Sequence, residues 1–280
     1  MRDALIVSLF SLLPRNRLAR LMGRVARLRL PAWLHRLVIR WYVRHYRVDL
    51  SQTAGAPEDH ATLADFFARP LKDGARPICA DPDAVVSPVD ALVAWTGPVR
   101  DGLVPQGAHH AVDLRILLDG DHPFEGGDGA ILYLAPPDYH RVHVPREGRV
   151  VRWTYLPGRL FPVFPACAER VPGLLARNER LVTWFEGDAG SVALVMVGAF
   201  GVGRMSAAYT DLLANCGAPV ADARPDPPPT FARGAELGRF NLGSTVILFF
   251  APGRVDLAIR TGQRVRVGAR IGTLRPPGVC

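Results

Sequence analysis

The chain has 280 residues, of which 49% are hydrophobic and 21% charged, and its formal net charge is +8. This composition excludes an intrinsically disordered protein, and the length suffices for one large domain with a hydrophobic core. Its four cysteines, Cys79, Cys167, Cys216 and Cys280, form neither a C-x-x-C pair nor a zinc-ligand pattern, so we expect no metal site and a reduced environment.

The positive charge is concentrated in the first 50 residues, which contain eleven arginines against Asp3 and Asp49. Residues 4–13 form a largely apolar run, but a helix that spans a bilayer needs about 20 such residues. Arginines rather than small residues follow this run, so we expect it to be retained and not removed as a signal peptide. The remaining chain is nearly neutral and carries no nucleic-acid-binding motif, so we expect no nucleic-acid partner.

Two amphipathic helices are predicted within residues 1–50, one on each side of Pro31. Large apolar residues share one side of each helix, and arginines form a neighbouring stripe: Leu18, Leu21, Met22, Val25 and Leu28 beside Arg17, Arg20, Arg24 and Arg27, then Leu34, Leu37, Val38 and Trp41 beside Arg36, Arg40, Arg44 and Arg47. Such helices lie at the headgroup level of a membrane, where each arginine adds roughly 1 kcal/mol of attraction to anionic lipid. We therefore predict that residues 1–50 bind an anionic membrane surface. The alternative is a helical hairpin packed on the domain with its arginines in water.

Beyond residue 84 the sequence predicts mostly strands. Short runs rich in β-branched and aromatic residues alternate with glycine and proline, at residues 91–95, 130–134, 141–144, 150–155, 191–197, 202–207, 245–250 and 255–259. Short helices are expected at residues 63–67 and 171–176. The predicted fold class is α+β, with a mainly antiparallel β barrel or sandwich as its core and the amphipathic helices before it.

Ser244 follows Gly243 and precedes the apolar run at residues 246–250. A serine hydroxyl in this position can attack the carbonyl of the preceding residue, and glycine leaves that carbonyl open because it has no Cβ. The acyl group then shifts from nitrogen to oxygen, and elimination followed by hydrolysis leaves a pyruvoyl group on a chain cut between Gly243 and Ser244. Taken alone, a Gly-Ser pair at the entrance of a strand is more often a turn.

The lysine content favours an electrophile made from serine. Lys72 is the only lysine, and it lies in the polar, turn-like stretch Lys72-Asp73-Gly74. A pyridoxal enzyme holds its cofactor through a lysine, and a solvated side chain does not suit that task.

Several ordered motifs accompany the Gly243-Ser244 pair. They are Phe66-Phe67-Ala68-Arg69-Pro70-Leu71-Lys72, Gly74-Ala75-Arg76-Pro77-Ile78, Ser87-Pro88-Val89-Asp90, Tyr139-His140-Arg141-Val142-His143, Leu160-Phe161-Pro162-Val163 and Asn178-Glu179-Arg180. In these motifs the chain resembles the phosphatidylserine decarboxylases, which are pyruvoyl-dependent enzymes, over residues 66–253.

The resemblance implies an activity and a domain organisation. Residues 51–280 would form a pyruvoyl decarboxylase domain that cleaves itself into residues 1–243 (β chain) and 244–280 (α chain). The pyruvoyl group derived from Ser244 would form a Schiff base with phosphatidylserine, release carbon dioxide and give phosphatidylethanolamine. The family also implies a peripheral location on the cytoplasmic face of the bacterial cell membrane and a homodimer of processed units.

The resemblance also assigns roles to individual residues. Asp90 would orient His143, and His143 would remove the proton of Ser244, whose hydroxyl attacks Gly243. His140 would act in decarboxylation as a proton donor. Since His140 and His143 are three residues apart, a regular strand would point them to opposite faces, which implies separate roles or a local bulge.

Other interpretations of the same residues stay open. Without the resemblance, Asp90 fits a turn after Pro88 and His143 fits a hydrogen-bonded strand histidine. Arg141 and Arg239 are candidates for binding the lipid phosphate. The alternative functions are a serine hydrolase that uses Ser244, His143 and Asp90 on an external ester, and a non-enzymatic peripheral module that binds anionic lipid.

Overall fold

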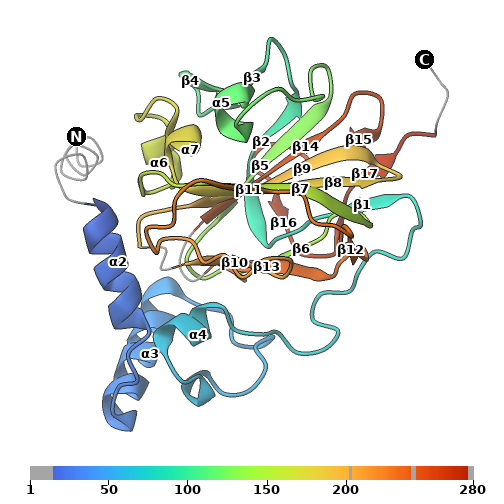
Figure 1. Ribbon diagram of the computed structural model, residues 1–280. Coiled ribbons are helices and arrows are strands. Elements are labelled where there is room, and N and C mark those ends of the chain that lie inside the picture. The colour runs from blue at the N-terminus through green and yellow to red at the C-terminus, as the bar shows by residue number, and fades with distance from the viewer. Residues whose placement is uncertain (1–14, 202–203, 241–243, 277–280) are drawn as a thin grey trace.

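Antiparallel strands make up most of the chain beyond residue 84, and the longest helices gather at its N-terminal end (Figure 1). The computed structural model describes residues 15–201, 204–240 and 244–276. Its helices are α2 (Arg15–Ala26), α3 (Ala32–Tyr46), α4 (Leu63–Phe67), α5 (Leu114–Leu118), α6 (Pro165–Ala168) and α7 (Leu174–Arg177), with a 3-10 turn at Pro57–Asp59. The apolar run predicted at residues 4–13 lies outside the described residues.

A nine-stranded sheet dominates the part of the chain that the structure describes. In spatial order its strands are β11 (Ala221–Ala223), β7 (Gly148–Leu156), β8 (Arg180–Gly187), β9 (Gly190–Gly198), β14 (Ser244–Phe250), β5 (Asp128–Leu134), β2 (Ala91–Pro98) and β16 (Arg264–Val265), and β12 (Thr230–Phe231) also pairs with β7. Since this order begins at β11 and ends at β16, the described strands form an open sheet and not a closed barrel.

Three smaller sheets surround the large one. They are β1 (Ala84–Val86) with β17 (Arg270–Leu274) and β15 (Val255–Leu257); β10 (Met205–Ala207) with β13 (Glu236–Phe240) and β6 (Arg141–His143); and the hairpin of β3 (Leu103–Gln106) and β4 (His110–Asp113). Every pairing between named strands is antiparallel. The predicted α+β class is therefore confirmed, in its sandwich-like form.

Most predicted elements coincide with observed ones. The helix predicted at residues 63–67 is α4, and the predicted strands match β2, β5, β6, β7, β9, β10, β14 and β15, although residues 202–203 lie outside the described residues. The helix predicted at 171–176 was placed too early, because Pro172 has no backbone N–H to donate and Gly173 adopts a left-handed φ of +62°. The sequence did not predict the strands β1, β3, β4, β8, β11, β12, β13, β16 and β17 or the short helices α5 and α6.

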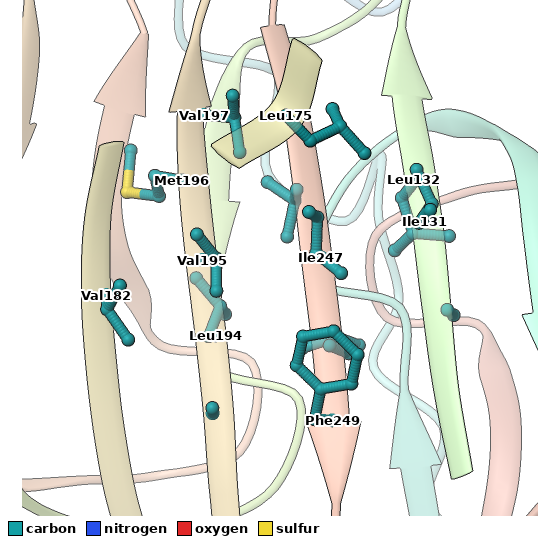
Figure 2. Close-up of a cluster of buried hydrophobic side chains, with 14 of the residues drawn as sticks. Ile131, Leu132, Leu175, Val182, Leu194, Val195, Met196, Val197, Ile247 and Phe249 are labelled. Carbon is teal, nitrogen blue, oxygen red and sulfur yellow. The ribbon is translucent and has the colours of Figure 1, made fainter. Parts of the chain in front are cut away.

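β14 is the central strand of the core. Its apolar run is hydrogen-bonded on one side to β5 and on the other to β9, which places Ile247 opposite both Ile131 and Val195. Figure 2 shows these side chains side by side with Phe249 below them, and all of them are buried. Because both edges of β14 are paired and its side chains are buried, its first residue, Ser244, has a fixed position in the sheet.

The N-terminal helices bury their smaller or polar side chains against the rest of the chain. α2 turns Ala19, Gly23 and Ala26 inward, at the spacing of one helical face. α3 buries His35, Ile39 and Tyr42, the last two in a small second core with Val48, Phe66 and Phe67. Of the described helices, none combines the length and the apolar character that crossing a bilayer requires. This second core fixes α4 against α3.

We predict that Phe249→Ala lowers the free energy of unfolding by about 3–5 kcal/mol, because it leaves a cavity in the core next to Phe124. Urea denaturation followed by circular dichroism measures this change. Leu103→Ala is the control, since Leu103 is half exposed on β3 and its truncation should change stability by about 0.5 kcal/mol or less. Equal effects of both substitutions would contradict the central place given to β14.

Candidate active site

Ser244 begins β14 and is completely buried, with 0% of its surface exposed. Its backbone lies between Leu134 of β5 and Gly198 of β9. The Ser244 Oγ has no hydrogen-bond partner among the described residues. Gly243, the other half of the predicted cleavage site, lies outside them. A buried hydroxyl without a partner is costly, which makes it a candidate for chemistry rather than for structure.

His140 lies beside the segment that leads into Ser244. The loop that carries it starts at Leu134, the neighbour of Ser244, and the His140 carbonyl accepts a hydrogen bond from Phe240 N at 3.0 Å. Its Nδ1 donates to the carbonyl of Asp138 at 2.8 Å, and the Phe67 ring lies 4.0 Å away between centroids. Nε2 has no partner among the described residues, so it offers a free lone pair.

Burial lowers the pKa of His140 to about 3, although its bond to the Asp138 carbonyl raises it; the charge of Arg69 lowers it further. The imidazole is therefore neutral at pH 7. Since Nδ1 carries the proton, Nε2 is an acceptor in this state.

His143 occupies a different environment, as the spacing of the two histidines predicted. Its Nδ1 donates to the carbonyl of Gly234 at 2.8 Å, and its Nε2 accepts the hydroxyl of Tyr139 at 3.1 Å. Burial lowers the pKa of His143, while the Gly234 carbonyl and the charges of Glu236 and Asp90 raise it in part. Burial also raises the pKa of Tyr139 to about 12, which keeps its hydroxyl protonated. Both nitrogens of His143 are thus engaged.

Asp90 lies at the end of the turn before β2, and this turn contacts the strand of His143. The backbone N–H of His143 donates to the carbonyl of Pro88 at 2.8 Å. The Asp90 carboxylate itself accepts bonds from Arg76 and from Val267 N, the latter at 2.9 Å. The structure therefore brings the two motifs together, but among the described residues no hydrogen bond joins Asp90 to His143. The charge of Asp90 contributes only a small part of the electrostatic environment that sets the pKa of His143.

The Asn178-Glu179-Arg180 motif supports the sheet beside Ser244. Asn178 is fully buried, and its Nδ2 donates to the carbonyls of Phe161 and Gly198, both at 2.9 Å. Gly198 is the β9 residue opposite Ser244. Asn178 therefore holds the end of β9 to the 160–163 segment, which explains why two distant motifs occur in one chain.

The two arginines considered for phosphate binding have an acidic partner. Arg141 donates to Glu236 at 2.8 Å and to the carbonyl of Ala68, and Arg239 also pairs with Glu236. Their charges are largely taken up within the protein.

The sequence analysis did not assign roles to three residues that shape this site: Tyr139 beside His143, Arg76 on Asp90, and Arg69 near His140. Each belongs to a motif that carries the resemblance, so the signal was present. Only the structure connects each of them to a particular histidine or aspartate.

The fold and the site define an α+β protein whose central strand begins with a buried serine, next to a loop that carries one histidine, His140, and leads into the strand that carries another, His143. A family model described as phosphatidylserine decarboxylase matches residues 63–273, and a second one, described as PSD, matches residues 5–47. The chain belongs to the phosphatidylserine decarboxylase family, which confirms the resemblance stated above.

Known proteins resemble this chain along nearly its whole length. The phosphatidylserine decarboxylase proenzyme of Anaeromyxobacter sp. (strain K) is 43% identical over 281 residues, which cover 97% of this chain and 99% of that protein. The protein of the same name from Shewanella loihica is 42% identical and covers 89% of this chain and 90% of its own. That of Aliivibrio salmonicida is 40% identical, with 96% and 97% covered.

The buried, neutral state of His140 predicts a loss of stability in acid. A free imidazole titrates near pH 6.5, whereas folded His140 titrates near pH 3. Between these two values the unfolded chain binds a proton that the folded chain does not, so the free energy of unfolding decreases as the pH is lowered. From pH 7 to pH 5 the loss due to His140 is about 2 kcal/mol. His140→Asn in a Ser244→Ala chain should remove this part, as urea denaturation at both pH values measures. An unchanged pH dependence would contradict the neutral state.

Proposed function

We propose that this chain is made as a proenzyme, cleaves itself between Gly243 and Ser244, and then decarboxylates phosphatidylserine to phosphatidylethanolamine. The observation that carries the proposal is the position of Ser244, which is sealed from solvent at the start of the central strand with its hydroxyl free of partners. The names of the relatives, which are proenzymes of this decarboxylase, support it. The products are residues 1–243 and 244–280.

The self-cleavage assigns one step to each group. His143 takes the proton of Ser244, whose oxygen attacks the Gly243 carbonyl; the peptide C–N bond breaks and the freed amine takes a proton, leaving an ester. Elimination releases the Gly243 carboxylate and leaves dehydroalanine at position 244, and water converts this to a pyruvoyl group with release of ammonia. In the described conformation the Tyr139 hydroxyl donates its hydrogen bond to Nε2 of His143. The Ser244 proton therefore reaches Nε2 either through the Tyr139 hydroxyl or after the Tyr139 side chain has rotated away.

The residues fit a pyruvoyl group better than they fit pyridoxal. Lys72 is exposed and its Nζ donates to the carbonyl of Ser51 at 2.8 Å, so it faces solvent rather than the site. A pyruvoyl group at position 244 supplies a ketone that draws electrons from the breaking carbon–carboxylate bond. His140, on the loop that follows the strand neighbour of Ser244, presents an unprotonated Nε2 at neutral pH, so it accepts a proton there before it can pass one on.

The burial of Ser244 argues against the serine hydrolase alternative. A hydrolase must present its serine to an external ester, whereas in the uncut chain a hydroxyl with no exposed surface meets only groups of its own chain. Its own preceding carbonyl is such a group. The proposed pyruvoyl group forms only after the cut, which must open this position to the lipid.

We also propose that α2 and α3 bind the anionic lipid surface on the cytoplasmic face of the bacterial cell membrane. Both helices expose large apolar side chains, namely Leu21, Met22 and Val25 on α2 and Trp33, Leu37 and Trp41 on α3, and Leu28 in the connection between them is exposed as well. An apolar groove of about 440 Å³ runs between them. A hairpin that only packed on the domain would bury these side chains, so their exposure favours the membrane interpretation.

This surface is connected to the site. The Tyr42 hydroxyl of α3 donates to the carbonyl of Pro136 at 2.7 Å, in the loop that leads to His140. A lipid held at the helices therefore has its headgroup near His140 while its acyl chains stay in the bilayer. Each methylene exposed to water instead would cost about 0.8 kcal/mol.

Denaturing mass spectrometry of the purified chain tests the proposed cleavage. We expect fragments of residues 1–243 and 244–280, and release of carbon dioxide from phosphatidylserine. Ser244→Ala and His143→Ala should leave one uncut chain, because each removes a group of the cleavage step, whereas His140→Ala should be cut but inactive. Ser206→Ala, in β10, is the matched control and should be cut normally. An active wild-type chain with an intact 243–244 bond would refute the proposal.

Sedimentation with phosphatidylglycerol-containing liposomes tests the membrane surface. The double substitution Leu37→Glu and Trp41→Glu should lower the bound fraction at least tenfold, because it replaces two exposed apolar side chains by charges that repel anionic lipid. Ile116→Glu is the control, since Ile116 is 61% exposed but lies on α5, far from α2 and α3 (Figure 1). Equal binding of all variants would overturn this part of the proposal.

A further inference from the structure

Arg69, two residues after α4, carries a buried positive charge that the protein does not saturate. The residue is 3% exposed. Its Nη2 donates to the carbonyl of Pro137 at 2.9 Å, and its guanidinium lies over the Phe66 ring, 5.2 Å from the centroid. Its Nε and Nη1 are buried and have no partner among the described residues. Burial lowers the pKa of Arg69, but a guanidinium stays charged at neutral pH.

Among the described residues, the two other arginines that are buried as whole residues are satisfied. Arg180 donates to the carbonyls of Ile116, Leu117, Ala176 and Asn178, and Arg146 pairs with Asp188. The partly exposed Arg27 and Arg204 each leave one buried nitrogen without a partner, whereas Arg69 leaves two. The two free donors of Arg69 therefore point to a missing acceptor.

A cavity of about 150 Å³ opens beside Arg69. Three further arginines line it, together with three aspartates: Arg76, Arg264 and Arg266 with Asp49, Asp90 and Asp138. The carboxylates already have partners, since Asp90 holds Arg76, Asp138 holds Arg264, and Asp49 accepts from Ser51 N. Arg69 is left with donors to offer, so the cavity suits an anion.

The cavity borders the loop of His140. Pro137, Asp138 and Tyr139 line it, and the Asp138 carbonyl accepts the His140 Nδ1 proton. Arg69 itself bonds Pro137, and its charge contributes to the lowered pKa of His140, so the two side chains lie within electrostatic reach. An anion bound at Arg69 would thus lie next to the histidine assigned to decarboxylation.

We propose that Arg69 binds the phosphodiester of the lipid substrate through its free Nε and Nη1. This inference rests on the proposed function for the identity of the substrate. A phosphodiester keeps its charge throughout the reaction, and the free donors of a guanidinium form charge-assisted hydrogen bonds with its oxygens. The substrate carboxylate is a poorer ligand, because it loses its charge as carbon dioxide leaves, and a strong arginine contact would stabilise the ground state over the transition state.

Binding to the uncut Ser244→Ala chain tests the site without any chemistry. Isothermal titration with glycerophosphoserine should give saturable binding, and adding Arg69→Met should weaken it at least tenfold. Arg69→Lys should recover part of the affinity, since lysine keeps the positive charge but lacks the separate N–H donors of the guanidinium. Arg180→Met, which removes another buried arginine, should lower stability but leave the affinity within about twofold. Inorganic phosphate binding as tightly as the diester would overturn the lipid assignment, and equal affinities of the parent chain and Arg69→Met would overturn the site.

Kinetics of the processed enzyme on a short-chain, soluble phosphatidylserine separate binding from chemistry. Mass spectrometry first establishes cleavage in each variant. Arg69→Met should raise KM at least tenfold with kcat within about threefold, because the contact is the same in ground and transition states. A lower kcat at unchanged KM would refute the phosphate role. If the wild-type chain is never cut, the proposed function fails, while the titration above still decides the anion site.

Discussion

The pairing of β14 on both of its edges is the constraint on which the site depends. β5 and β9 hold its backbone, and the buried side chains of residues such as Ile247 and Phe249 lock its register. Both faces of β14 are buried, so a shift by one residue would exchange the side chains packed on the two faces and disrupt the close packing of the core. Ser244 is therefore fixed at the first position of a strand that is paired on both edges. Its hydroxyl in the uncut chain is separated from water and from external substrates. The only reactive carbonyl that such a serine needs to reach is the one before it in the chain.

Unsatisfied polar groups collect around this strand end. The Oγ of Ser244, the Nε2 of His140 and two donors of Arg69 are all buried without partners among the described residues. Each costs stability, and groups of this kind are uncommon in native interiors. Six further buried atoms without partners lie elsewhere among the described residues, on Arg27, His35, Thr53, His60, Trp184 and Arg204, whereas Asn178 makes three amide hydrogen bonds. The proposed chemistry would use the free donors and acceptors beside Ser244.

The N-terminal helices are part of the site and also its exposed flank. α3 and α4 contact the site loop through Tyr42 and Phe67, while the opposite side of α2 and α3 presents Trp33, Leu37 and Trp41 to solvent. The small core of Ile39, Tyr42, Val48, Phe66 and Phe67 connects the exposed surface of α3 to the loop of His140, so a shift of α3 would displace residues that contact this loop. This arrangement would link the proposed lipid binding to the position of His140.

The sequence by itself determined the fold class, the central strand after Gly243 and the presence of the motifs, because local periodicity and residue type are legible without a structure. It named Asp90, His140, His143 and Ser244 through the resemblance. Only the tertiary structure decided what each group touches. It turned the Asp90 carboxylate toward Arg76, placed Tyr139 on His143 and left Arg69 unsaturated near His140. These contacts join residues from separate strands and turns, and their energies depend on burial and on neighbours that no local pattern in the chain encodes.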